Sequence, residues 1–462
     1  MLLRSLQLCC LCTTAVALAS CATVIDPSAD FAAARSMIQD TTGTEFPFDP
    51  ALAALSVTEI ELVLAGGFTL DEALSLALAN NRHLHAGFLE LGVGHADFVQ
   101  AGLLKNPSLS LAFLLPSGGG RTRAGVDLVA SVAELWQLRQ REDVARLSQN
   151  QRILDLSRFA AELIVDTKSA YFQIVAVREA RAVAEQGMVL ARLVLAGVQR
   201  QVAIGVATRT DEELARAAVL NAELAYRRHS QGEEADKQRL ASLLSLNIDM
   251  REVRLTDSLP DADALAELDS ALVARGQQLR LDVRSATLAL ETANARVQLE
   301  RNRTIPAAAV GITSERPEGG SSAGFLGGIT GSVELPLFDQ NQAQVSRAEY
   351  RRDALAKELE ALAAEVAAQV RAALDRANAA RSTALFLERD VLPQAEASAA
   401  LAQRAYELGD TTVLSLLETQ QRVLQTRQDL VDARLEIART QLELERSVGM
   451  PLSVLRRTAS SQ

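Results

Sequence analysis

The sequence predicts a mainly α-helical protein with a small β part, built from a duplicated helix–β-hairpin–helix unit. The same order of signals occurs twice: Pro107 and Pro306 lie 199 residues apart, and Gly205 and Gly409 lie 204 residues apart. Each half also holds two short alternating segments between long stretches rich in Ala, Leu, Arg, Gln and Glu, which favour helix. The duplication therefore indicates one intertwined protomer rather than separate domains.

The alternating segments predict four strands, at about 107–116, 124–133, 306–315 and 328–337. In the first, Leu109, Leu111 and Phe113 share one face, and Ser108 and Ser110 share the other. The fourth alternates in the same way, with Ile329, Val333, Leu335 and Leu337 on one face. An apolar face opposite a small or polar face is typical of a membrane barrel with lipid outside and water inside. The alternative is a soluble hairpin or sandwich packed on the helices.

Four strands cannot close a membrane barrel, because such barrels have eight strands or more. The chain must therefore leave sheet edges open or share a barrel with copies of itself. No stretch after the N-terminal signal has about 18 consecutive apolar residues. Any membrane crossing is therefore expected from strands.

The N-terminus, residues 1–20, reads as a secretory signal, with Arg4 before an apolar run that ends in Leu18-Ala19-Ser20-Cys21. These residues resemble the lipobox of bacterial lipoproteins, which implies cleavage before Cys21 and acylation, including palmitate, at that residue. Ala22 in the next position implies the outer membrane. An ordinary signal peptide cut nearby is the alternative. The other three cysteines, Cys9, Cys10 and Cys12, precede this site, so no disulfide is expected.

The mature chain divides into an extended, lipidated N-terminal arm (21–66), a first repeat (67–250), a second repeat (251–450) and a C-terminal tail (451–462). Thr69 and Glu72 have the spacing of a capping box, and the helix that they start is interrupted near Asn81. Long helices are expected at 138–204 and 340–408, with Pro393 kinking the second. The remaining helices are expected at 211–246, 265–303 and 412–448. Apolar residues near heptad spacing predict a wall resembling a coiled coil.

Composition argues against several function classes. The net charge of −11 does not suit nucleic-acid binding, which requires a basic face. His83 and His85 are two residues apart on a helix and point to different sides, so a metal site is not expected. We find neither a nucleophile with its base nor a phosphate-binding glycine motif, so we expect no catalysis and no cofactor.

The whole pattern resembles the TolC-type outer-membrane efflux proteins over roughly residues 67–450. The resemblance rests on the duplicated order, on Asn106-Pro107, on Val333 to Asp339, and on Tyr406-Glu407-Leu408-Gly409. It implies a homotrimer with a 12-stranded outer-membrane β-barrel and a 12-helix periplasmic α-barrel. It also implies two partners, a periplasmic adaptor protein and an inner-membrane pump of the RND type. The implied function is the outer-membrane channel of a tripartite efflux system of a Gram-negative cell, lipid-anchored at Cys21.

The resemblance places adaptor docking and gating at the two helix turns. The docking candidates are Ile204, Gly205, Val206, Leu408, Gly409 and Asp410. The two gate aspartates of the family fall on Ser415 and Glu418, of which Glu418 keeps the charge; Asp211 lies 204 residues before Ser415. Asp211 and Glu418 are therefore candidates for an acidic selectivity ring, and solvated helix-start residues are the alternative. Tyr406 matches the tip tyrosine of the family, whereas Thr411 replaces a basic residue that locks the tip.

The competing hypothesis is a structural coiled-coil envelope lipoprotein that has no channel activity. It requires neither the alternating strands nor the duplication. Within the channel hypothesis the sequence leaves the cargo open between drugs and metal cations, and it does not identify the pump or the adaptor.

Overall fold

The computed structural model describes residues 25–44, 60, 64, 66–115, 122–132, 134–265, 271–316, 326–452 and 454. The signal and Cys21 lie outside these residues. The chain forms two compact units, and both repeats contribute to each. Unit 1 comprises Met1–Ala33, Glu90–Arg152 and Glu291–Tyr350, and unit 2 comprises Ala34–Leu89, Ile153–Leu290 and Arg351–Gln462. No helix among the described residues combines the length and the hydrophobicity that a membrane span needs.

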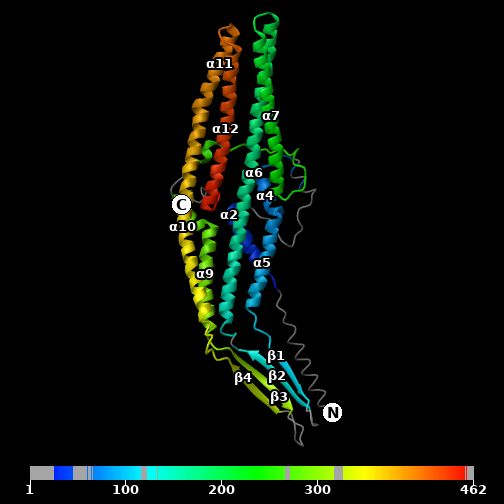
Figure 1. The fold of residues 1–462 in the computed structure, drawn as a ribbon, viewed down its shortest axis with the longest axis vertical. Helices are drawn as coiled ribbons and strands as arrows, with labels where there is room; N and C mark the ends of the chain where they lie inside the picture. The colour runs from blue at the N-terminus through cyan, green and yellow to red at the C-terminus, as the bar shows by residue number, and fades with distance from the viewer. Residues whose placement is uncertain are drawn as a thin grey trace. The chain divides into compact units, whose positions relative to one another are not determined.

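The order of elements repeats the helix–hairpin–helix pattern (Figure 1). The first half contains α2 (Ser28–Thr42), α4 (Leu70–Asn80), α5 (Arg82–Ala101), β1 (Ser108–Leu114), β2 (Arg123–Ser131), α6 (Leu138–Ala203) and α7 (Arg209–Leu243). The second half contains the 3₁₀ turn η1 (Ala262–Leu265), α8 (Ala271–Leu279), α9 (Leu281–Asn302), β3 (Ala308–Arg316), β4 (Leu326–Val333), α10 (Gln342–Phe386), the π-helical segment η2 (Leu387–Val391), α11 (Leu392–Leu408) and α12 (Val413–Val448).

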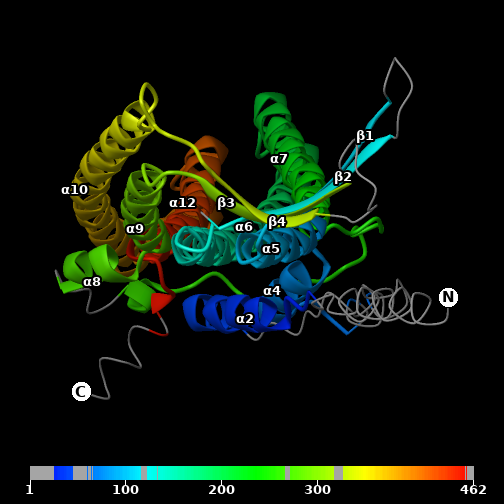
Figure 2. The same ribbon diagram turned by 90° about the horizontal axis from the view of Figure 1, so that it is seen from below.

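The strands of unit 1 form one antiparallel sheet in the order β1-β2-β3-β4, and Figures 1 and 2 show it as a single layer. The register places Leu111 opposite Val126, and Leu128 opposite Ile312. Because residues opposite each other share a face, one face is mainly apolar: besides Ser314 and Arg316 near its end, it carries Leu109, Leu111, Phe113, Val126, Leu128, Val310, Ile312, Ile329 and Val333. The alternation predicted for the first strand is thus confirmed, and that of the fourth is confirmed as far as Val333.

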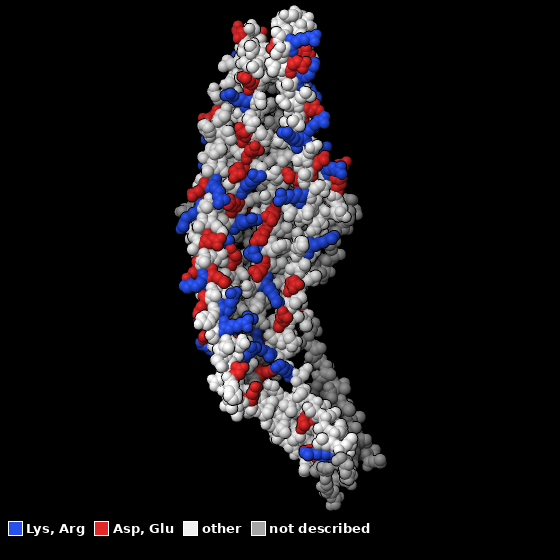
Figure 3. All heavy atoms as spheres, viewed as in Figure 1, with Lys and Arg blue, Asp and Glu red and all other residues white. Residues whose placement is uncertain are grey.

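The other face of the sheet carries mostly small and polar side chains, together with Leu114, Val129 and Leu326. Ser110 lies opposite Asp127, and Arg123 of β2 forms an ion pair with Glu315 of β3. Gly311 sits where the strands approach closely, because a Cβ there would lie 2.7 Å from the carbonyl oxygen of Leu128. Most of the sheet surface in Figure 3 is free of charged side chains.

The fourth strand is shorter than predicted. It ends at Val333, and the backbone N–H of Leu337 turns back to the carbonyl of Leu335 at 2.9 Å. Pro336 between them has no N–H to donate to a neighbouring strand, so Leu335 and Leu337 lie beyond the ladder.

In unit 2, helices α6 and α7 form one antiparallel pair, and α11 and α12 form another (Figure 1). Arg181 of α6 pairs with Glu233 of α7 at 2.9 Å, and α11 packs along α12. The two pairs meet where α12 lies against α6, as in the ion pair of Lys168 with Glu445. The predicted long helices are confirmed, with small shifts of their bounds. So are α7 and α12, which run back antiparallel to them and are called the return helices below.

The duplication extends to the helix interruptions. The helix breaks at Asn81, as predicted, and again at the equivalent position of the second repeat, Arg280, where one continuous helix was expected. Both residues reach the end of a return helix: the Asn81 amide donates to the carbonyl of Leu243 at 3.1 Å, and the Arg280 guanidinium donates to that of Ser447 at 3.4 Å. The Asp282 carboxylate then accepts the backbone N–H of Val283 and starts the new helix.

Two further sequence expectations have a structural outcome. Pro393 interrupts its helix as predicted, since five residues of π-helix directly precede α11 and one wide turn accommodates the missing N–H. The extended arm predicted for residues 21–66 is wrong over residues 28–42, which form α2. This segment is rich in alanine, and Asp30 in its first turn interacts favourably with the helix dipole.

Candidate gate at the helix turns

Both helix turns of unit 2 use the same local chemistry. Gly205 and Gly409 follow α6 and α11 with φ of +77° and +80°, a left-handed conformation that glycine adopts without strain. Thr208 and Thr412 then cap α7 and α12 with their hydroxyl oxygens. The duplication seen in the sequence is thus also a duplication of turn geometry.

The first turn uses Asp211 as a structural residue. Its carboxylate accepts the Thr208 hydroxyl at 2.7 Å and the Thr208 backbone N–H at 2.9 Å, which completes a capping box. These hydrogen bonds, the hydroxyl first, hold the pKa of Asp211 below its ordinary value. The helix-start alternative therefore describes the local geometry of this residue.

The second turn leaves its acidic residue free. Ser415 occupies the position of Asp211, and its backbone N–H donates to the Thr412 hydroxyl oxygen at 3.3 Å. Glu418, less than one turn further on, lies at the surface, and no hydrogen bond or ion pair joins its carboxylate to another described residue. Of the two acidic candidates, Glu418 is the one whose charge is available at the surface of the protomer.

A small apolar cluster holds the two turns together. Val198 of α6, Ala215 of α7 and Val413 of α12 are buried against one another, with Tyr406 and Leu417 packed around them. The Tyr406 hydroxyl donates to the side-chain carbonyl of Gln201 at 2.6 Å and so joins α11 to α6. Burial and the nearby charge of Asp211 raise the pKa of Tyr406, so its hydroxyl remains a donor at neutral pH.

Sequence reasoning missed Gln201 and the apolar cluster. The residue of the second repeat that corresponds to Gln201 is Ala405, so the duplication itself gave no signal for a polar partner. The heptad pattern predicted a wall of helices but did not show which apolar residues of three different helices meet in this cluster.

The docking candidates form the exposed ends of the turns. Ile204, Val206 and Leu408 are 75%, 72% and 78% exposed. Gly205, Gly409 and Asp410 are exposed beside them. Apolar side chains exposed at a helix end are typical of a protein-binding surface.

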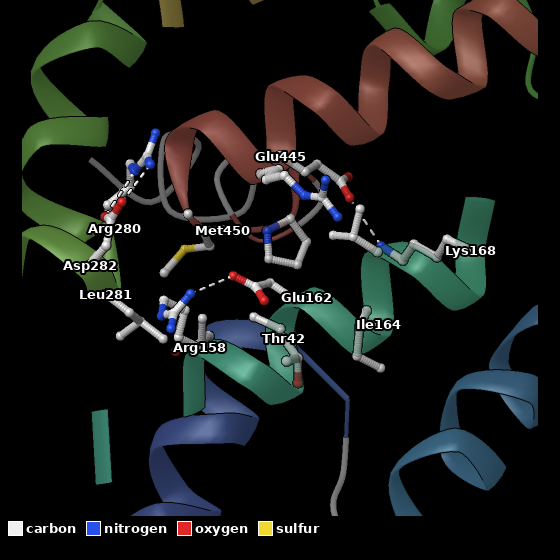
Figure 4. Close-up of a pocket in the computed structure, with 16 residues that line it drawn as sticks. Thr42, Arg158, Glu162, Ile164, Lys168, Arg280, Leu281, Asp282, Glu445 and Met450 are labelled. Atoms are coloured by element: carbon white, nitrogen blue, oxygen red, sulfur yellow. Dashed lines mark hydrogen bonds and ion pairs between the residues drawn. The ribbon is translucent and has the colours of Figure 1, made fainter. Parts of the chain in front are cut away.

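A cavity of about 110 Å³ lies elsewhere in unit 2, between the ends of α2 and α12 and the middle of α6 (Figure 4). Its charged residues are already paired: Lys168 with Glu445, Arg158 with Glu162, and Arg280 with Asp282. The cavity therefore offers no free charge to an ionic ligand.

The histidines do not gather into a metal site in the described part of the chain. Nδ1 of His95 lies 2.9 Å from the carboxylate of Asp30, and Nε2 of His85 lies 2.9 Å from the carbonyl of Ala79. No group of three or more His, Cys, Asp or Glu side chains there is arranged to hold a metal ion.

Comparison with known proteins gives a consistent result. Residues 272–450 match the family model described as outer membrane efflux protein. The chain is 25% identical over 368 residues to the cobalt-zinc-cadmium resistance protein CzcC of Cupriavidus metallidurans, which covers 77% of this chain and 84% of that protein.

Solved structures share the fold. The structure of CusC matches with a TM-score of 0.70 and 20% identity, over 82% of this chain and 92% of that one. The open state of the MtrE outer membrane channel of Neisseria gonorrhoeae matches with a TM-score of 0.67 and 20% identity, over 83% and 89%. The chain thus has the fold of these outer-membrane channels, and its residues 272–450 match the outer membrane efflux protein family.

Proposed function

We propose that this protein is the outer-membrane channel of a tripartite efflux system, and that it conducts cargo passively from an inner-membrane pump and a periplasmic adaptor to the exterior. The observation that carries the proposal is the sheet of unit 1. Its apolar face is exposed in the protomer, with Phe113 at 67% and Ile329 at 85%. Its opposite face carries mostly small and polar side chains. A lipid exterior and an aqueous interior account for both faces.

The edges of the sheet support assembly into a trimer. Among the described residues, β1 and β4 each pair with one strand only. Unpaired backbone groups are costly in lipid, so β4 of one copy must pair with β1 of the next. Three copies supply twelve strands, enough to close a barrel. The pair of Arg123 with Glu315 and the carboxylate of Asp127 then line the water-filled lumen.

The helix turns supply the docking and gating functions in this proposal. The exposed Ile204, Val206 and Leu408 suit contact with an adaptor protein, which in turn recruits a pump of the RND type. Three copies of Glu418 form an acidic ring that favours cations. Asp211, whose carboxylate is engaged in its own cap, adds to the field of this ring without lining it directly.

We also propose that acylated Cys21, which lies outside the described residues, anchors the protein in the outer membrane. Incorporation of radioactive palmitate into the wild type and its loss in Cys21→Ser test this anchor. Labelling of the variant equal to that of the wild type would exclude Cys21 as the acylated residue.

The cargo that best fits the observations is a metal cation. The relative CzcC is named for resistance to cobalt, zinc and cadmium, and a ring of Glu418 carboxylates suits cationic cargo. A strain lacking the gene should become sensitive to these metals and keep its resistance to drugs. Sensitivity to drugs alone would instead assign drug cargo.

Reconstitution into planar bilayers tests the channel function. Purified protein should give stable conductance steps with a preference for cations over anions. A coiled-coil spacer lipoprotein gives no steps, so a silent bilayer, with the protein shown to be inserted, would reject the channel.

A further inference from the structure

The contact between the two repeats within the chain has a regular register along its length. Lys168 and Asp166 of α6 pair with Glu445 and Arg446 of α12 at 3.1 and 2.8 Å. Further along, Gln173 accepts from Arg439 at 3.0 Å, and Gln186 accepts from Arg427 at 3.1 Å. From one of these contacts to the next, the residue number on α6 rises by nearly the amount by which the residue number on α12 falls. Such a constant register describes two antiparallel helices packed without slippage.

The same contact continues with apolar packing. Leu424 of α12 packs against Gly187 of α6 so closely that a Cβ on Gly187 would lie 2.8 Å from a Leu424 methyl group. Arg427 and Leu424 are therefore the residues by which a return helix of one repeat meets the long helix of the other.

The duplication repeats these two helices elsewhere in the chain. The return helix α12 corresponds to α7, and the two are aligned by their caps, Thr412 and Thr208. In this alignment Leu444 falls on Leu240, and both are fully buried. Arg427 then corresponds to Glu223, and Leu424 corresponds to Leu220.

The long helix α6 corresponds to α10 and α11, with one extra residue in the second repeat. Buried positions of α6 align without a gap with buried positions of α10, namely Leu163 with Val366, Thr167 with Val370, Tyr171 with Leu374, and Ile174 with Ala377. Beyond η2, equivalent residues lie one position further apart in the sequence than they do in α10, since buried Ala191 aligns with buried Ala395. The π-helical segment, Leu387–Val391, therefore holds the extra residue. The counterpart of Gln186 is Arg389 or Asp390.

In the described part of the protomer the counterpart contact is not made: Glu223 pairs only within its own helix, with Arg227 at 2.6 Å. Leu220 is 62% exposed, whereas its counterpart Leu424 is partly buried against Gly187. Arg389 is exposed, and no hydrogen bond or ion pair joins its guanidinium to another described residue. α7 and α11 form the two sides of the row of helices in which α12 meets α6 (Figure 1), so a second copy is needed to bring their outer faces together.

We propose that α7 of one copy packs antiparallel against η2 and α11 of the next copy in the register of the α6–α12 contact, with Glu223 paired to Arg389. Of the two counterparts of Gln186, the guanidinium of Arg389 attracts the Glu223 carboxylate, whereas Asp390 repels it. Leu220 then covers the π-helical segment of the neighbouring copy. This inference rests on the proposed trimer and adds the residues by which the copies recognise one another.

Disulfide trapping in the full-length protein tests the register, because Cys21 is the only cysteine after the signal. Glu223→Cys combined with Arg389→Cys should give covalent dimers and trimers on a non-reducing gel. Asn221→Cys with Arg389→Cys is the matched control: it lies on the same turn of α7 but faces about 200° away. Gln186→Cys with Arg427→Cys should cross-link within one chain and leave its mass unchanged.

The outcomes separate this inference from the channel proposal. If native mass spectrometry in detergent finds three chains but the 223/389 pair links no better than the 221/389 pair, the register is wrong and the trimer stands. If only single chains are found, both fail. As a second test, Glu223→Arg should weaken the trimer and Glu223→Arg with Arg389→Glu should restore it. A double variant as weak as the single one would overturn the pairing.

Discussion

Lys168 and Glu445 form an ion pair of 3.1 Å across the contact between the two repeats, and their side chains are only 15% and 5% exposed. The Glu445 carboxylate also accepts the backbone N–H of Leu452 and the side-chain amide of Gln441. The pair lines the cavity at the end of α12 (Figure 4). It therefore ties α6 to both the return helix and the residues that follow it.

The first prediction concerns this pair. Lys168→Met removes the cation and leaves a buried carboxylate without its charge partner, which costs about 3 kcal/mol of folding stability. Asp166→Asn is the matched control, because its pair with Arg446 lies in the same contact but is about half exposed on both sides. That substitution should cost about 0–1 kcal/mol. Guanidinium unfolding followed by circular dichroism at the helix band measures both, and equal shifts would show that burial does not set the strength of the pair.

The second prediction concerns the hydrogen bond between Tyr406 and Gln201. Tyr406→Phe removes the hydroxyl and leaves the ring, so it weakens the join between α11 and α6 by about 1 kcal/mol. If this join holds the closed state, the open fraction should rise about fivefold. Leak conductance in planar bilayers measures it. Tyr350→Phe, which alters a 75% exposed ring on α10, is the control, and a Tyr406 variant that leaks no more than this control would remove the residue from the gate.

The third prediction separates the two acidic candidates. Glu418→Gln removes three free carboxylates from the proposed trimer and should abolish most of the cation preference and the block by multivalent cations. Asp211→Asn should change both less, because that carboxylate is engaged with Thr208. Reversal potentials in a salt gradient measure the preference. The ranking would be wrong if Asp211→Asn had the larger effect.

The fourth prediction follows from the lowered pKa of Asp211. A carboxyl whose pKa is lower in the folded state stabilises that state above its ordinary pKa of 3.8, and this contribution is lost as the pH falls through the lower folded value. The first turn of α7 should therefore begin to fray at acid pH. Hydrogen exchange of its amides between about pH 5 and pH 2.5, corrected for the intrinsic rate, measures this loss.

The second helix turn provides an internal control for this experiment. Ser415 stands where Asp211 stands, so the start of α12 should show no such acid-dependent change. Asp211→Asn should make the two turns behave alike. If α7 and α12 fray in parallel in the wild type, the cap carboxylate does not control the pH response.

The sequence predicted those features that local pattern determines. Alternation assigned Leu109, Leu111 and Phe113 to one face of the first strand, and the register places them opposite Leu128, Val126 and Ala124, which are also apolar. The duplication located the turns at Gly205 and Gly409, where a left-handed residue is needed. These features depend on a few adjacent residues, so the chain itself carries the information.

Features that depend on distant partners could not be predicted. The helix break at Arg280 depends on a distant partner, because its guanidinium donates to the carbonyl of Ser447 at the end of α12. The hydrogen bond from Tyr406 needs Gln201, which lies on a helix of the other repeat. For Asp211 the sequence allowed both a ring and a solvated helix-start residue, and only the structure shows the capping box with Thr208.

The fifth prediction concerns close packing in the sheet. A Cβ on Gly311 would lie 2.7 Å from the Leu128 carbonyl and 2.9 Å from the Thr330 hydroxyl, so Gly311→Val must push neighbouring strands apart. The cost of such overpacking is about 1–3 kcal/mol per copy. Gly331→Val is the control, since the nearest atom to a Cβ there is 4.0 Å away and the residue lies on the apolar face.

The two glycine variants should therefore differ in assembly. Each copy contributes its sheet to the proposed barrel, so the strain caused by Gly311→Val is present in all three sheets of the trimer. The variant should therefore lower the yield of assembled protein in outer-membrane fractions. Gly331→Val should assemble like the wild type. Non-denaturing gels of membrane extracts compare the two, and a Gly311 variant that assembles normally would show that the strands can separate at this point without loss of the sheet.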